Sequence, residues 1–311
     1  MNTFPCQHCN DRTLTSATSG KVVRVGHYLR KSDSALIQKF HCIQGKHYFS
    51  SASNDPRFKQ KKRHLNPIIF KLLCAGVSHR EIGRLLSIKF LTVDRKRRYL
   101  SQRALLWSKE FLKNKDPVGK MQFDDMETFE HSKLKPLSIT LAVEKGSRLI
   151  LGFRVASMPA KGLLVKRALK KYGPRPDHRS KARAHLFKDL REHLRENVHI
   201  ESDQNPHYEP AVKRHFPKAL YQTFKGRRGC VVGQGELKSG GFDPLFSLNH
   251  TCAMLRANIN RLFRRTWCTT KKPENLTEHL WIYAQSHNQR IWKKVKNQNP
   301  NFNKLTLGWV I

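Results

Sequence analysis

The sequence lacks any long apolar run, any internal repeat and any low-complexity segment. No stretch approaches the ~20 apolar residues that a membrane-spanning helix needs, and the first residues lack the apolar segment of a secretory signal. These absences exclude a membrane protein and a repeat architecture. We therefore expect a cytoplasmic protein with no membrane partner.

Acidic residues are also scarce. The chain of 311 residues has 23 Asp and Glu against 60 Lys and Arg, so its formal net charge is +37. A positive field of this strength attracts polyanions, and nucleic acid is the polyanion that a cytoplasmic protein meets. The composition predicts a DNA partner and a nucleoid-associated location.

Cysteine is too sparse, and odd in number, for a disulfide framework, since the chain has seven. Two of them, Cys6 and Cys9, have the spacing of metal ligands. With Cys42 they would supply three ligands of a structural zinc ion in a small zinc ribbon over residues 1–58. A repeated knuckle would place cysteine where Gly45 stands. We therefore expect the fourth ligand to be a histidine, and the candidates, in order of preference, are His47, His41 and His8.

Three short helices are predicted within residues 59–105. The first begins at Asn66 and Pro67 and ends at Gly76, and the second is capped by Ser78 with Glu81 three residues later. The third runs from about Leu91 to Arg103 and carries four consecutive basic residues, expected to face largely outward. This succession is typical of a helix-turn-helix DNA-binding domain. The residues expected to contact DNA there are Arg95, Lys96 and Arg98, and residues 106–119 form a helical connector and linker.

A catalytic domain is predicted over residues 120–290, with a tail over 291–311. The alternation of Met121 and Phe123 followed by Asp124 predicts a strand that presents a carboxylate at its end. Two further strands, 137–143 and 149–156, complete an antiparallel meander. A helix over 184–196 then leads to a strand, 198–203, that ends in Asp203.

Carboxylates at the ends of two strands suit a site for two Mg²⁺ ions. Asp124 and Asp203 are the predicted ligands. We expect alternation along each strand to turn Asp125 and Glu201 away from the site.

The remaining segments are a basic loop, a strand and two helices. The loop, 170–183, is either solvated or in contact with DNA. The strand covers 219–224, and the helices cover 244–266 and 276–287.

Together these motifs resemble the DDE transposases of small bacterial insertion sequences, in the type that joins a zinc finger and a helix-turn-helix to a catalytic domain. The resemblance rests on Phe-Asp-Asp-Met-x-Thr-Phe at 123–129, Ser-Asp-x-x-x-x-Tyr at 202–208, Leu-Arg-x-x-Ile-x-Arg-Leu-x-Arg-Arg-Thr at 255–266, Lys271 and His-Asn at 287–288. It implies an α/β protein with a ribonuclease-H-like catalytic core. It also implies Mg²⁺-dependent cutting at terminal inverted repeats and insertion at a target site.

The third acid of that family falls at Asn249 in this sequence. An asparagine can bind Mg²⁺ through its carbonyl oxygen but brings no charge, so Glu236 and Asp243 remain alternatives. The residues expected to bind phosphates beside the metal ions are Arg256, Arg261, Arg264 and Lys271. A homo-oligomer is implied as well, because two DNA ends must be held together.

The sequence therefore predicts a transposase that binds terminal inverted repeats, cleaves DNA and transfers the cut strand. Two other functions stay open. One is a DNA-binding regulator or decayed transposase without catalysis, and the other is a nuclease of the same fold that cuts without strand transfer.

Overall fold

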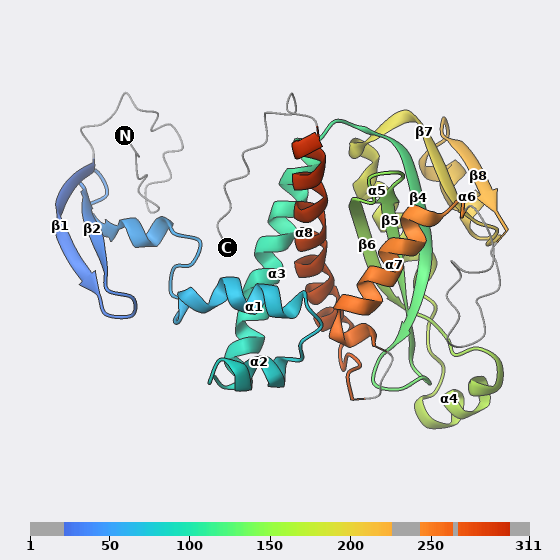
Figure 1. Cartoon of the computed structure of the whole chain (residues 1–311), viewed down its shortest axis with the longest axis horizontal. Coiled ribbons are helices and arrows are strands. Elements are labelled where there is room, and N and C mark those ends of the chain that lie inside the picture. Colours follow the sequence, from blue (N-terminus) through green and yellow to red (C-terminus); the bar gives the residue numbers. More distant parts are fainter. Residues whose placement is uncertain (1–21, 226–242, 264–266, 299–311) are drawn as a thin grey trace. The chain divides into compact units, whose positions relative to one another are not determined.

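The computed structural model describes residues 22–225, 243–263 and 267–298 of the chain (Figure 1). The chain divides into two compact units, 1–67 and 68–311, and each is described by itself. It is a mixed α/β protein with one sheet in each unit. No helix within the described ranges is both long and apolar enough to cross a membrane.

The N-terminal unit contains a three-stranded antiparallel sheet in the order β1-β2-β3. The strands are β1 (Val22–Arg30), β2 (Ala35–Cys42) and β3 (His47–Ser50). Each hairpin turn contains a non-glycine residue with positive φ, Ser34 at 52° and Lys46 at 51°. The Phe40 and Phe49 rings stack at 5.3 Å between neighbouring strands. A short 3₁₀ turn, η2 (Ser51–Asn54), follows.

Three helices precede the second sheet: α1 (Asn66–Leu73), α2 (His79–Leu85) and α3 (Phe90–Lys113). The predicted capping box is confirmed, because the amide of Glu81 donates to Ser78 Oγ at 3.2 Å. The third helix continues for 24 residues, through most of the predicted connector. It can do so because Trp107 and Phe111 are buried, with the Trp292 ring of α8 (Pro273–Gln298) edge-on to Phe111 at 5.1 Å.

The second sheet has five strands in the order β6-β5-β4-β7-β8. The predicted meander is present as β4 (Val118–Phe129), β5 (Pro136–Glu144) and β6 (Ile150–Ser157), which pair antiparallel. Strands β7 (Leu194–Asp203) and β8 (Leu220–Phe224) then add to β4 in parallel. Strand β4 is therefore the central strand of the sheet.

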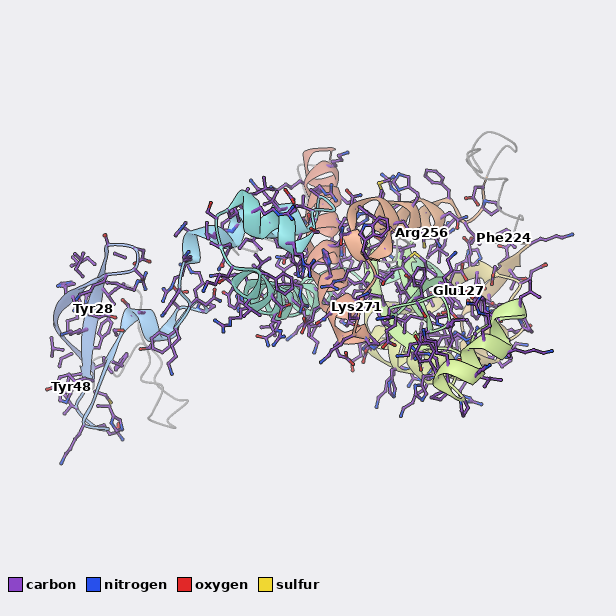
Figure 2. The ribbon with its side chains drawn as sticks, turned by 90° about the horizontal axis from the view of Figure 1, so that it is seen from below. Tyr28, Tyr48, Glu127, Phe224, Arg256 and Lys271 are labelled. Carbon is purple, nitrogen blue, oxygen red and sulfur yellow. The ribbon has the colours of Figure 1, made fainter. Side chains whose placement is uncertain are left out.

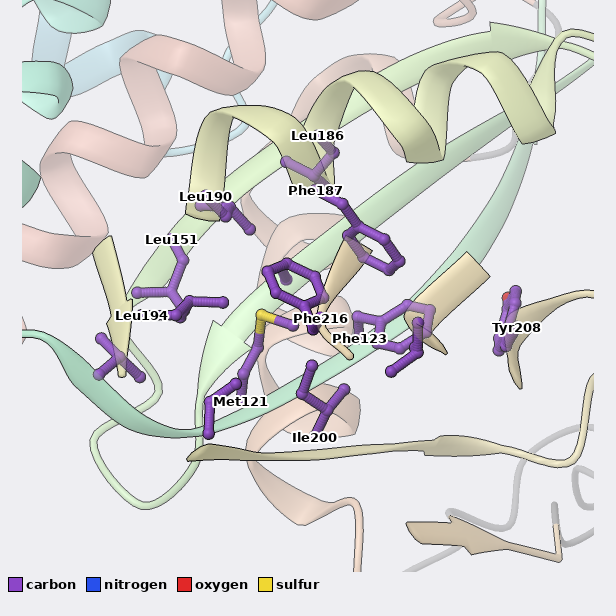
Figure 3. Packing of buried hydrophobic residues seen from close by; sticks show 14 residues of the cluster. Met121, Phe123, Leu151, Leu186, Phe187, Leu190, Leu194, Ile200, Tyr208 and Phe216 are labelled. Atoms are coloured by element: carbon purple, nitrogen blue, oxygen red, sulfur yellow. The ribbon is translucent and has the colours of Figure 1, made fainter. Parts of the chain in front are cut away.

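Helix α5 (Arg179–Leu190) covers one face of this sheet and α7 (Phe246–Asn258) covers the other (Figure 1). The core on the α5 face is apolar and includes α6 (Tyr208–His215) (Figure 3). Phe123 meets the ring of Phe187 edge-on at 5.0 Å. The neighbours of Phe123 along β4, Gln122 and Asp124, point to the opposite face of the sheet, under α7. That face therefore carries polar side chains of the strand.

Several predicted helix ends were wrong. The helix expected over 184–196 is α5, which starts and ends earlier, because Leu194 is a buried core residue that begins β7. The helix expected over 244–266 stops at Asn258, where Ile259 adopts an extended conformation before a 3₁₀ turn, η7 (Asn260–Leu262).

The basic segment predicted as a loop over 170–183 is partly helical. A 3₁₀ turn, η4 (Gly162–Leu164), leads into α4 (Val165–Tyr172), and α5 already begins at Arg179. A last 3₁₀ turn, η5 (Arg191–His193), joins α5 to β7. Helix α8 begins before the predicted 276 and reaches Gln298, well into the predicted tail.

Candidate functional site

Two aspartates occupy equivalent positions on neighbouring strands. Strands β4 and β7 run parallel with Gln122 opposite Glu201. Two residues further along each strand, and therefore on the same face of the sheet, stand Asp124 and Asp203. Both side chains are partly buried. The fold thus brings together the two predicted metal ligands.

The electrostatics of this pair favour a cation between them. Burial, together with the charge of Asp203, raises the pKa of Asp124 to about 6. Burial also raises the pKa of Asp203, although a hydrogen bond from the Asn205 amide lowers it in part. The charge of Asp125 also raises the pKa of Asp203. Carboxylates whose proton affinity is raised by burial and by neighbouring carboxylates are ligands that a divalent ion stabilises.

A buried tyrosine holds Asp124 in place. The Tyr208 hydroxyl donates to Asp124 Oδ1 at 2.9 Å, and it accepts the amide of Asp125 at 3.0 Å. The tyrosine side chain is fully buried, and Arg183 lies over its ring at 4.4 Å. Sequence reasoning missed this role for Tyr208, although the residue closes the Ser-Asp-x-x-x-x-Tyr motif.

Asp125 points away from the pair, as expected. Its carboxylate accepts hydrogen bonds from Thr140 on β5 and from Arg183 on α5, the latter at 2.9 Å. Arg183 also donates to the carbonyl of His207 just before α6. Asp125 therefore anchors α5 and the start of α6 to the sheet behind the site.

The expectation that Glu201 also turns away was wrong. Residues two apart on a strand share a face, so Glu201 lies on the same face as Asp203. It is 1% exposed and both its oxygens are engaged, one by Lys145 in an ion pair and the other by Gln122 Nε2 at 2.7 Å. A carboxylate committed in this way serves the structure beneath the site.

Gln122 fastens the start of α7 to the sheet. Besides Glu201, its Nε2 donates to the carbonyl of Pro244 at 2.8 Å, and its Oε1 accepts the amide of Leu248 at 3.1 Å. Sequence reasoning missed this residue. The available signal was a polar side chain on β4 in phase with Asp124, between two core residues.

Helix α7 presents Asn249 but no acid. Asn249 Nδ2 donates to Asp243 Oδ2 at 2.9 Å, which leaves the amide oxygen as the end that can reach a cation. Asp243 also accepts the amide of Leu245 at 2.9 Å, so it caps the chain entering the helix. Glu236 lies outside the described residues. Within the described ranges, no three His, Cys, Asp or Glu side chains group to hold a metal.

Cys252 lies one turn after Asn249 on α7, and sequence reasoning missed it too. Burial, with the charge of Asp124, raises the pKa of the Cys252 thiol to about 12. The thiol stays protonated at neutral pH and does not replace a third acid.

The basic residues predicted on α3 divide into two groups. Arg95 and Arg98 are exposed, and Arg98 pairs with Asp94 at 2.9 Å. Lys96 and Arg97, expected to face outward, are buried at 5% and 0% exposure. They share a helix stripe with the core residues Val93 and Leu100, so the prediction for Lys96 was wrong.

The buried Arg97 joins α3 to α8. It forms an ion pair with Glu278 and hydrogen bonds at 2.9 Å with Asp94 and with Asn275. Arg261, predicted to bind phosphate, is half-buried near Arg97. Partial burial, with the charge of Arg97, lowers its pKa to about 10. Its Nε has no hydrogen-bond partner within the described part of the chain.

Two of the remaining predicted phosphate contacts are exposed. Arg256 lies on α7 and Lys271 precedes α8, and both are labelled in Figure 2. Arg264 lies outside the described residues.

The predicted zinc ligands are only partly described. Cys42 is buried and stands opposite His47 in the β2–β3 register, and its sulfur accepts the amide of Gly45 at 3.4 Å. The His41 ring stacks on Tyr48 at 4.4 Å, on the sheet that carries the labels Tyr28 and Tyr48 in Figure 2. Cys6, His8 and Cys9 lie outside the described residues, so the described ranges contain no zinc site.

Comparison with known proteins adds no relative. No model of a known protein family matches the chain, and no curated protein has a matching sequence.

Proposed function

We propose that this protein is a metal-dependent DNA transposase of the insertion-sequence type. One observation carries the proposal: the parallel register of β4 and β7 aligns Asp124 with Asp203 on one face of the sheet. Two neighbouring strands of one sheet, separated in the chain by a meander and a helix and each presenting an aspartate on the same face, are the arrangement of a two-metal site in a ribonuclease-H-like core. The net charge of +37 supplies the attraction for DNA.

The donor set fits divalent magnesium. Asp124, Asp203 and the amide oxygen of Asn249 are the hard oxygen ligands that Mg²⁺ prefers. Two Mg²⁺ ions held there would activate the attacking oxygen and stabilise the leaving oxygen of a phosphodiester. With Asn249 in place of an acid, the second ion binds more weakly.

The chain's own residues orient the ligands and exclude water. Tyr208 and the Asp125 amide fix one oxygen of Asp124, so its other oxygen is the one that faces a ligand. Gln122 fastens the start of α7, the helix that carries Asn249, to the strand that carries Asp124. Arg256 on the exposed side of that helix is placed to bind a phosphate of the DNA.

Helices α1 to α3 are proposed to form a helix-turn-helix that reads the terminal repeats. Its last helix exposes Arg95 and Arg98, which would contact the major groove or its phosphates. A zinc ribbon that includes Cys42 and His47 is proposed for the N-terminal unit. Two chains are expected to act together, because two DNA ends must be joined.

A DNA-binding regulator without catalysis is the second candidate. It is favoured by one observation, the Asn249 amide where an acid is expected. A nuclease that cuts without joining strands has the same site, so only the products distinguish it from a transposase.

The test incubates the purified protein with a linear fragment that carries the DNA flanking its own gene, with Mg²⁺ or Mn²⁺. Asp124→Ala is compared with the control Asp116→Ala, which removes an exposed aspartate in the segment between α3 and β4. End cleavage and joining that the first variant loses and the control keeps would support the proposal. Cleavage without joining would identify the nuclease, and no metal-dependent cleavage by wild type would favour the regulator.

A further inference from the structure

A short basic projection follows strand β6. It comprises residues 161–172, with η4 and helix α4, and Ala168 is the one side chain of α4 that is buried. Figure 1 shows α4 at the end of the sheet. A helix that buries so little of itself gains almost no stability from packing within this chain. Its surface is therefore available to a partner.

The charge of the projection has one sign. Four cations, Lys166, Arg167, Lys170 and Lys171, are exposed within two turns, and residues 161–172 include no acid. None of the four forms an ion pair with a carboxylate of the described ranges. Like charges this close repel one another, so they favour a polyanionic partner that spans all four.

The projection also exposes apolar side chains. Leu163 is 98% exposed and Leu169 is 51% exposed. Flanked by cations, such residues fit a surface that offers both phosphates and an apolar interior. The grooves of duplex DNA have this combination, because sugars and base edges lie between two phosphate backbones. A second copy of this chain, at +37, would bring repulsion instead.

Both ends of the projection are tied to β4 or to the residue after it. Lys161 bonds Glu127 at 2.5 Å, and Arg175, just beyond α4, bonds Glu130, which follows β4, at 2.9 Å. Glu127 is three residues beyond Asp124 on β4, a rise of about 10 Å along the strand, and its odd offset turns its side chain to the face opposite Asp124. The projection therefore lies at the end of the sheet beyond Asp124, where a duplex that reaches the two aspartates around that end can contact α4 (Figure 1).

We propose that residues 161–172 form a second DNA-contacting element, separate from α3, which holds the duplex beside the Asp124–Asp203 site. The four cations bind phosphates, and Leu163 contacts a groove. This inference rests on the proposed function for DNA as the partner, but it needs no catalysis. A membrane surface with anionic lipids is the other polyanion, and the test includes it.

The experiment measures DNA binding by the full chain in EDTA over a series of salt concentrations, using the fragment described above. Lys166, Arg167, Lys170 and Lys171 are changed together to Gln. The matched control changes four exposed lysines of α3 and α8 to Gln, namely Lys109, Lys113, Lys293 and Lys294. Both variants have the same net charge, so a difference in their DNA binding reports where the removed charges lie. Circular dichroism checks that both are folded.

The α4 variant should reduce the steepness of log K against log salt by about 3.6, since each of the four phosphate contacts contributes about 0.9. The control should change the slope by less than about 1. Equal changes in the two variants would overturn the inference. So would binding of vesicles with anionic lipid that depends on the four cations while the DNA slope does not.

A third variant, Leu163→Ser, separates DNA contact from self-association. Weaker DNA binding at unchanged mass in sedimentation would support the inference, and a change in mass with unchanged DNA binding would overturn it. Loss of cleavage in every assay would refute the proposed activity yet leave the slope difference standing. The two failures are therefore distinguishable.

Discussion

The charge of Asp124 should destabilise the metal-free fold. Its pKa rises from 3.8 to about 6 through burial and the charge of Asp203. The folded state thus favours the protonated side chain, and stability is lost as the pH rises through about 6. Asp124→Asn mimics the protonated form at every pH, and its amide oxygen can still accept the bonds from Tyr208 and the Asp125 amide.

The size of the effect follows from the shift. A rise of about two pKa units corresponds to about 3 kcal/mol of unfolding free energy at pH 7.5, where wild type has lost the full amount. At about pH 4.5 the two proteins should differ by only about 1 kcal/mol. At that pH Asp124 is still protonated in folded wild type, so wild type has lost only part of the stability that it loses by about pH 7.5. Other titrating groups are common to both proteins and cancel in the difference.

Urea unfolding in EDTA at both pH values measures these differences. Added Mg²⁺ should then make wild type the more stable of the two proteins. Mg²⁺ stabilises wild type by binding its folded state, and the variant lacks the Asp124 carboxylate as a ligand. Asp116→Asn serves as the control and should match wild type throughout. A variant less stable than wild type at pH 7.5, or a gain that is independent of pH, would refute the assignment of Asp124 as a carboxylate destabilised by burial and by the charge of Asp203.

Three further outcomes are expected. Tyr208→Phe should lower the unfolding free energy by about 1–2 kcal/mol, since it removes a buried hydrogen bond to Asp124; unchanged urea midpoints would contradict this role. Asn249→Asp should tighten Mg²⁺ binding at least severalfold in isothermal titration calorimetry, whereas unaltered affinity would place that helix position outside the site. Burial lowers the pKa of both His79 and His279 to about 3, so the stability they contribute is fully present above about pH 6.5 and falls by about 1.4 kcal/mol per pH unit for each as the pH drops. In urea unfolding between about pH 6 and pH 5, the unfolding free energy of His79→Gln should fall less steeply than that of wild type. An identical fall would exclude His79 as a source of this pH dependence.

Local patterns in the sequence were enough for the elements that depend on neighbours along the chain. Alternation predicted the meander and the position of Asp124, and Ser78 with Glu81 predicted the start of α2. Of the two predicted strand ends, Asp203 does end β7, but the prediction for Asp124 was wrong, because β4 continues beyond it to Phe129. The correct predictions succeed since strand alternation and capping are set within a few residues.

Tertiary structure alone decided which polar side chains face the interior. Arg97 has the same sequence context as the exposed Arg95 and Arg98, yet α8, which arrives from far along the chain, buries it. Glu201 could be placed on the site's face by alternation, but its engagement by Lys145 and Gln122 depends on how β4, β7 and the β5–β6 turn come together.

The same division applies to the candidate site. The sequence by itself determined that two apolar strands carry Asp124 and Asp203 and that the chain is strongly cationic. Only the fold decided that β4 and β7 are parallel neighbours in a register that aligns Asp124 with Asp203, and that Tyr208 reaches back to orient one of them. Strand pairing and burial depend on contacts between distant segments, and those contacts leave no periodic signal in the sequence.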